Sequence, residues 1–98
     1  MNDTKISAME HWDKRYINND TPWLNDISIL SPIKELINNQ ISKNIKILEI
    51  GCGNGKHSIW IAKQGFDVVA IDISKTAIAH SISNAFGINN IKFICGDY

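Results

Sequence analysis

The stretch that decides the fold runs Lys46-Ile47-Leu48-Glu49-Ile50-Gly51-Cys52-Gly53-Asn54-Gly55. It begins as a short apolar strand, carries an acidic residue near its end and continues into three alternating glycines. Glycine removes the side chain where a loop must lie close to a ligand. Because a segment with helical spacing follows, the order is strand, glycine loop and helix. That order is typical of a site for a nucleotide-like cofactor.

The spacing of the glycines argues against a dinucleotide. A dinucleotide fingerprint needs glycine at the position of Lys56, whereas the third glycine of this chain is Gly55. Glu49 would also repel a pyrophosphate lying near the N-terminus of the following helix. A ligand that carries an ammonium or sulfonium group would instead be attracted. The alternative left open is that the glycines only form a tight strand-to-helix turn.

The composition is that of one small globular unit. The chain has 98 residues, of which 44% are hydrophobic and 20% charged, with a formal net charge of +0. No overall field draws it to nucleic acid or to anionic lipid, and it has neither a signal-type leader nor an apolar run of membrane-spanning length. We therefore expect a cytoplasmic protein. Cys52 and Cys95 lack metal-ligand spacing, so we expect two reduced, buried thiols and no metal.

Two helices are expected before the glycine stretch. Apolar and aromatic residues at helical spacing predict an amphipathic helix over 6–16. Ser31 and Pro32 then resemble an N-cap followed by proline in the first turn, and this second helix fades near Ser42.

From position 45 onward, strands and helices alternate. Strands are expected over 45–50, 67–71 and 91–94, and helices over 56–64 and from the Ser74 cap to Gly87. The first strand is almost continuously apolar, as expected when both faces are covered. The second helix of this part carries Ile78, Ile82 and Phe86 on one face. The fold class is therefore α/β, with parallel strands in the order 3-2-1.

Two acidic residues follow the second and third strands. Asp72 stands where a carboxylate accepts hydrogen bonds from vicinal ribose hydroxyls in nucleotide-binding folds, or where it helps to cap the next helix. In Gly96-Asp97-Tyr98, Asp97 offers an acceptor for an adenine amino group and Tyr98 a flat apolar surface, although the segment also suits an ordinary turn. Because parallel strands end at one edge of the sheet, these side chains and the glycine loop lie close together.

Taken in this order, the three elements resemble the first three motifs of class I S-adenosylmethionine-dependent methyltransferases. The resemblance covers 45–98 and implies the N-terminal half of a Rossmann-like sheet with S-adenosyl-L-methionine as cofactor. It implies that Glu49 and the backbone of Gly51, Cys52 and Gly53 approach the amino-acid part of the cofactor. It further implies that Asp72 holds the ribose, Ile73 packs on adenine and Asp97 binds the adenine amino group.

The N-terminal segment carries a second resemblance. His11-Trp12-Asp13-Lys14-Arg15-Tyr16 and Pro22-Trp23 are similar to the Trp-Asp-x-x-Tyr and Pro-Trp elements of small-molecule methyltransferases of the thiopurine and tellurite-resistance type. The resemblance implies that this segment folds over the cofactor. Trp12, Tyr16 and Trp23 would then offer aromatic faces to the sulfonium. In the alternative, Trp12 and Tyr16 are simply the buried face of a helix.

The sequence therefore predicts a helical cap segment over 1–44 and an incomplete cofactor-binding domain over 45–98. We expect the N-terminal portion of a methyltransferase with a small-molecule acceptor, with no catalytic residue assigned and with His57 and His80 solvated. One alternative is an inactive remnant or binding module that needs a partner, which includes self-association through the open edge of the first strand. The other alternative is a fragment of an NAD(P)-binding oxidoreductase.

Overall fold

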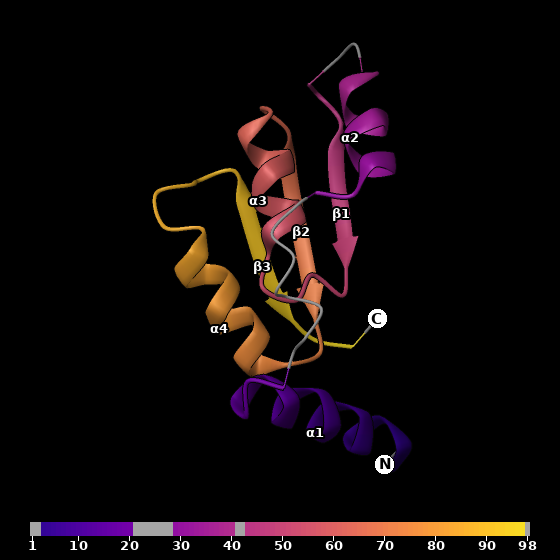
Figure 1. The fold of residues 1–98 in the computed structure, drawn as a ribbon, viewed down its shortest axis with the longest axis vertical. Helices are drawn as coiled ribbons and strands as arrows, with labels where there is room; N and C mark the ends of the chain where they lie inside the picture. Colours follow the sequence, from indigo (N-terminus) through magenta and orange to yellow (C-terminus); the bar gives the residue numbers. More distant parts are fainter. Residues whose placement is uncertain (1–2, 21–28, 41–42, 98) are drawn as a thin grey trace.

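The chain folds as a three-stranded parallel sheet with helices, seen in a computed structural model that describes residues 3–20, 29–40 and 43–97 (Figure 1). Its elements are α1 (Asp3–Ile17), α2 (Ser31–Asn38), β1 (Lys46–Ile50), α3 (Lys56–Lys63), β2 (Asp67–Asp72), α4 (Lys75–Asn84) and β3 (Ile91–Cys95). The strands lie in the order β1-β2-β3, and both pairs are parallel. The predicted α/β class and strand order are thereby confirmed.

The capping residues at the starts of α2 and α4 can be compared with those predicted from the sequence. Ser74 caps α4 as predicted, because its Oγ accepts a hydrogen bond from the N–H of Ala77 at 3.1 Å. The prediction that Ser31 caps α2 is wrong. The carbonyl of Leu30 already accepts hydrogen bonds from Ile33 and from Lys34, so Leu30 is the capping residue and Ser31 is the first residue of the helix.

The core lies on one face of the sheet. Ile37 of α2 and Ile61 of α3 are buried together with Phe66 and Val68, and a second cluster joins Ala70 to residues of the glycine loop and α4. Figure 1 shows α3 and α4 over this same face of the strands. The packing of Ile37 ties α2 into the core of the sheet, while the predicted domain boundary at position 44 stays a prediction.

The opposite face of β1 is not covered by the described residues. Leu48 and Ile50 are 57% and 53% exposed, and they lie in register with Val69 and Ile71 of β2. In the described part of the chain, the expectation that both faces of this strand are covered is therefore wrong. β1 also forms one edge of the described sheet, and self-association through that edge stays a prediction.

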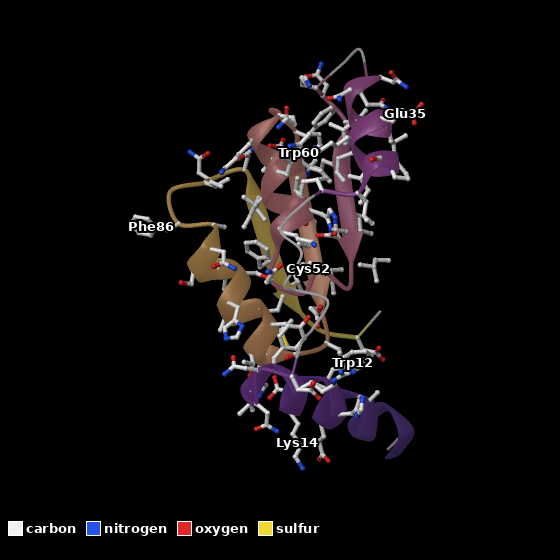
Figure 2. All side chains as sticks on the ribbon, viewed as in Figure 1. Trp12, Lys14, Glu35, Cys52, Trp60 and Phe86 are labelled. Carbon is white, nitrogen blue, oxygen red and sulfur yellow. The ribbon has the colours of Figure 1, made fainter. Side chains whose placement is uncertain are left out.

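The buried face of α4 is shorter than predicted. Ile78 is buried, but Ile82 is 56% exposed and Phe86 is 93% exposed and points away from the molecule (Figure 2). For Phe86 the physical reason is that α4 ends at Asn84, with Ala85 as its C-cap. Phe86 lies beyond the helix, so the helical period no longer sets its direction.

α1 occupies a different place from the other helices. It lies across the carboxyl ends of the strands and contacts α4 (Figure 1). None of the helices in the described ranges is long and apolar enough to cross a membrane.

Phe66 and Phe86 offer a matched test of the core. Phe66 is 0% exposed, so Phe66→Ala leaves a cavity and should lower the free energy of unfolding by about 3–5 kcal/mol. Phe86→Ala should change it by less than about 0.5 kcal/mol, because that ring packs on little. Urea denaturation of the full-length protein measures both, and equal losses would contradict the packing described.

Candidate functional site

The loops that follow the three strands meet at one edge of the sheet. The N–H of Gly51 donates to the carbonyl of Ile71 at 2.8 Å, which joins the end of β1 to the end of β2. The N–H of Gly96 donates to the carbonyl of Asp72 at 2.9 Å, which joins the end of β3 to the same strand. The glycine loop, Asp72 and the start of the segment with Asp97 are thus neighbours, as the sequence predicts.

Asp72 is the centre of this edge. One carboxylate oxygen accepts a hydrogen bond from the N–H of Gly53 at 2.9 Å, and the other accepts one from the N–H of Ser74 at 3.0 Å. The side chain joins the glycine loop to the cap of α4, and the residue is only 6% exposed. Each carboxylate oxygen has a second lone pair, so further hydroxyl donors can still be accepted through the small exposed part.

The backbone of the glycine loop is mostly satisfied within the protein. Gly51 and Cys52 both donate to the carbonyl of Ile71, and Gly55 donates to the carbonyl of Cys52 at 2.9 Å. Since Gly53 donates to Asp72, four N–H groups of the loop are engaged. A phosphate cradle needs such groups to point at the ligand. The geometry therefore agrees with the exclusion of a pyrophosphate.

Ser81 holds the glycine loop from the side of α4, which the sequence analysis missed. Its fully buried Oγ donates to the carbonyl of Gly53 at 2.6 Å. Gly55 has φ of +84°, and a Cβ built there would lie 3.1 Å from this Oγ. Ser81 lies seven residues after Ser74 on the helix that the Ser74 cap begins. This spacing places both on one face of the helix but does not identify Gly53 as a partner.

The two cysteines differ in environment. Cys52 is buried, and this burial raises the pKa of its thiol to about 12, so the thiol is unreactive at neutral pH. The prediction that Cys95 is buried as well is wrong. Cys95 is the last residue of β3, where its side chain is exposed.

Glu49 lies under the first turn of α3. Its Oε1 accepts a hydrogen bond from the Oγ of Ser58 at 2.5 Å, and its Oε2 lies 3.7 Å from Nδ1 of His57. Burial raises the pKa of Glu49, and the nearby Asp72 adds to this effect, while the bond from Ser58 opposes it. The carboxylate also lies near the positive end of the helix, which favours its charge.

His57 is not solvated, contrary to expectation. Its side chain is 16% exposed, and Nε2 is buried with no hydrogen-bond partner among the described residues. Burial lowers the pKa of this imidazole and Lys56 lowers it further, so His57 is neutral at pH 7. His80 is exposed on α4, as expected.

Ile73 follows Asp72 and lines a small pocket of about 170 Å³ between α1 and the turn from β2 to α4. The remaining lining residues come from both sides: Met9, Glu10, Asp13 and Lys75. Asp97 is exposed just beyond β3. The pocket combines apolar walls with carboxylates, which suits a flat heterocycle with amino donors.

The predicted aromatic residues are only partly described. Trp12 is 40% exposed, lies on the side of α1 nearer the sheet, and has the guanidinium of Arg15 5.7 Å from its ring centroid (Figure 2). Tyr16 is 5% exposed, with its ring edge-to-face to His80. Trp23 and Tyr98 lie outside the described residues.

These features suit a cofactor that carries adenosine and a positive charge. The carboxylate of Asp72 has lone pairs left for further donors, and a pocket of mixed apolar and charged lining lies beside it. The half-buried carboxylate of Glu49 lies under the loop, while the N–H groups of Gly51, Cys52, Gly53 and Gly55 are engaged within the protein. Fold and site together define a Rossmann-like methyltransferase domain of class I. The chain belongs to the thiopurine S-methyltransferase family, whose sequence model matches residues 7–97.

Individual relatives agree with this assignment. EEF1A lysine methyltransferase 2 of Homo sapiens is 29% identical over 95% of this chain and 45% of that protein. Probable thiol methyltransferase 2 of Arabidopsis thaliana is 32% identical over 84% of this chain and 36% of that protein. The plantazolicin methyltransferase BpumL, solved with S-adenosylhomocysteine, is 28% identical, with a TM-score of 0.54 over 96% of this chain and 40% of that one.

This chain spans less than half the length of the relatives named above. The comparisons confirm the methyltransferase class and S-adenosylmethionine as the cofactor of that class. Of the classes that the sequence left open, they favour the methyltransferase over the NAD(P)-binding oxidoreductase.

The raised pKa of Glu49 leads to a test of pH dependence. Folding favours the protonated form of Glu49. The contribution of this residue to the free energy of unfolding is therefore greatest below its unfolded pKa of about 4.3, and it is lost as the pH rises through the folded pKa. Glu49→Gln keeps an acceptor for Ser58 without the charge. It should raise the free energy of unfolding at pH 7 and flatten the decrease in stability that begins as the pH rises above the unfolded pKa.

Urea denaturation at a series of pH values measures this difference. Glu35→Gln, which changes an exposed carboxyl on α2, is the matched control and should leave the pH profile unchanged. A Glu49→Gln protein that is less stable than the wild type at pH 7 would contradict the role of burial.

Proposed function

We propose that this chain forms the cofactor-binding part of an S-adenosylmethionine-dependent methyltransferase that acts on a small molecule. The observation that carries the proposal is the junction at Asp72, where one carboxylate joins the glycine loop to the cap of α4. This junction fixes the two loops that would lie on either side of the ribose. A preorganised site of this kind binds its ligand without first paying for ordering.

Each predicted residue has a role in the proposal. The remaining lone pairs of Asp72 accept the ribose hydroxyls, Ile73 packs on adenine and Asp97 accepts the adenine amino group. Gly51 supports this arrangement because it is exposed, whereas Cys52 and Gly53 are buried. The backbone from Gly51 to Gly53 would lie against the amino-acid part.

The positive charge of the cofactor has two candidate partners. Glu49 supplies a half-buried carboxylate under the loop. The ring of Trp12 is proposed as the second partner; because the guanidinium of Arg15 lies 5.7 Å from its centroid, a sulfonium would have to displace that group or use the other face. Tyr16 and Trp23 are proposed as further aromatic contacts, and Tyr98 as a flat surface beside the adenine.

The acceptor is proposed from the family. The matching family is named for thiopurine S-methylation, and the Arabidopsis thaliana relative is described as a probable thiol methyltransferase. The human relative is described as a lysine methyltransferase, so a protein acceptor is the competing class. No catalytic residue is assigned, and the chain is proposed to act in the cytoplasm without nucleic acid, membrane or metal as partner.

Calorimetry with S-adenosylhomocysteine tests the cofactor site in the full-length protein. The wild type should show saturable binding, and Asp97→Asn should weaken it by up to about tenfold, because the adenine amino group would then donate to a neutral amide oxygen instead of a charged carboxylate. Asp72→Asn should weaken binding at least as strongly. Asp67→Asn, at the opposite end of β2, should bind as the wild type does.

Asp72→Asn also disturbs the glycine loop, since its amide replaces one acceptor by a donor. Asp97→Asn is therefore the decisive variant for the adenosine contacts. A wild type without saturable binding would sink the proposed function. Equal binding by the wild type and both variants would contradict the proposed contacts of Asp72 and Asp97 with adenosine.

A labelling experiment separates the acceptor classes. The full-length protein is incubated with S-adenosylmethionine that carries a labelled methyl group, together with a panel of low-molecular-weight thiols and, separately, a protein extract. We expect transfer to a small thiol. Label that accumulates only in protein would contradict the proposed small-molecule acceptor and indicate a protein acceptor instead.

A further inference from the structure

A chain of hydrogen bonds leads from α1 to the glycine loop. Oδ1 of Asp13 accepts from the Oγ of Ser74 and from the N–H of Thr76, each at 2.8 Å. The N–H of Ser74 donates to Asp72 at 3.0 Å, and Asp72 accepts from the N–H of Gly53 at 2.9 Å. Three segments far apart in sequence are thus joined through adjacent polar groups.

The hydrogen bonds to Asp13 favour its charged form. Burial alone raises the pKa of Asp13, but the hydrogen bonds from Thr76 and Ser74 outweigh it, with a further contribution from Lys75, and the net pKa lies below its ordinary value. The first turn of α4 has no acidic residue of its own. Asp13 therefore supplies from another helix the negative charge that favours a helix N-terminus.

The same contact builds one wall of the pocket beside Ile73. Met9, Glu10 and Asp13 of α1 form one side of this pocket, and Ile73 and Lys75 form the other. Ile73 directly follows Asp72, so a ligand held at Asp72 is within reach of this wall. If α1 moved away from α4, the pocket would lose three of its five lining residues.

We propose that Asp13 is a positioning residue for the cofactor. It holds α1 against the cap of α4, and through Ser74 it links the place of α1 to Asp72 and the glycine loop. The packing of α1 against α4 and the binding of the cofactor then stabilise each other. Asp13 does not touch the cofactor in this proposal and acts through Ser74 and Thr76. This inference rests on the proposed function.

Two substitutions at position 13 test it in the full-length protein. Asp13→Ala removes the acceptor and should raise the Kd for S-adenosylhomocysteine by about tenfold, the usual size of coupling between two sites. Asp13→Asn keeps a neutral amide oxygen where Oδ1 stands and should restore part of the affinity. Rescue by Asn distinguishes the positioning role from a requirement for the charge alone.

Asp20→Ala is the matched control. Asp20 lies just after α1 and pairs with Arg15 at 3.4 Å, so its removal takes a carboxylate from the same region without touching the Ser74 contact. This variant should bind S-adenosylhomocysteine as the wild type does. Calorimetry measures all the affinities.

Hydrogen exchange supplies a second readout, which reports directly on α1. Saturating S-adenosylhomocysteine should slow exchange of the amides over 8–17 in the wild type, and Asp13→Ala should accelerate their exchange. A wild type that binds the ligand with no change over 8–17, or an Asp13→Ala variant with unchanged Kd, overturns the inference and leaves the proposed function intact. A wild type that does not bind overturns the proposed function.

Discussion

The structure depends on a buried carboxylate that must be satisfied. Asp72 is almost fully buried at the end of the central strand, and an unpaired carboxylate there would be strongly destabilising. The N–H groups of Gly53 and Ser74 satisfy it from the two neighbouring loops. The same two bonds fix where the glycine loop lies, where α4 begins and, through Ser74, where α1 is attached. A single side chain thus sets the relative position of the segments that form the candidate site.

Local patterns were enough to predict the strands, their order and the starts of α3 and α4, because these follow from hydrophobic period, glycines and caps. Ser74 was predicted correctly since its role is decided within four residues. Phe86 was placed wrongly because the end of α4 decides its direction. Asp13 and Ser81 were missed because their partners are distant in sequence and only the fold brings them together. The site was therefore predictable in outline, while the groups that hold it were not.

Glu49 illustrates a conflict between stability and binding. A carboxylate under the loop suits a cationic ligand, yet its burial penalises the charge in the free protein. The bond from Ser58 and the nearby start of α3 reduce this penalty without removing it. A charged Glu49 therefore lowers the free energy of unfolding. Such a cost is common where a binding site needs a group that destabilises the folded state.

The closeness of Gly55 to Ser81 changes what the glycine pattern means. A side chain at position 55 would meet Ser81 of α4 before any ligand was involved, and the backbone there has a conformation that favours glycine. Packing within the protein therefore requires glycine at position 55, whether or not a cofactor is bound. A descendant that had lost its methyl donor would still be under selection to keep this glycine. Asp97 is exposed, so a substitution there leaves this packing intact.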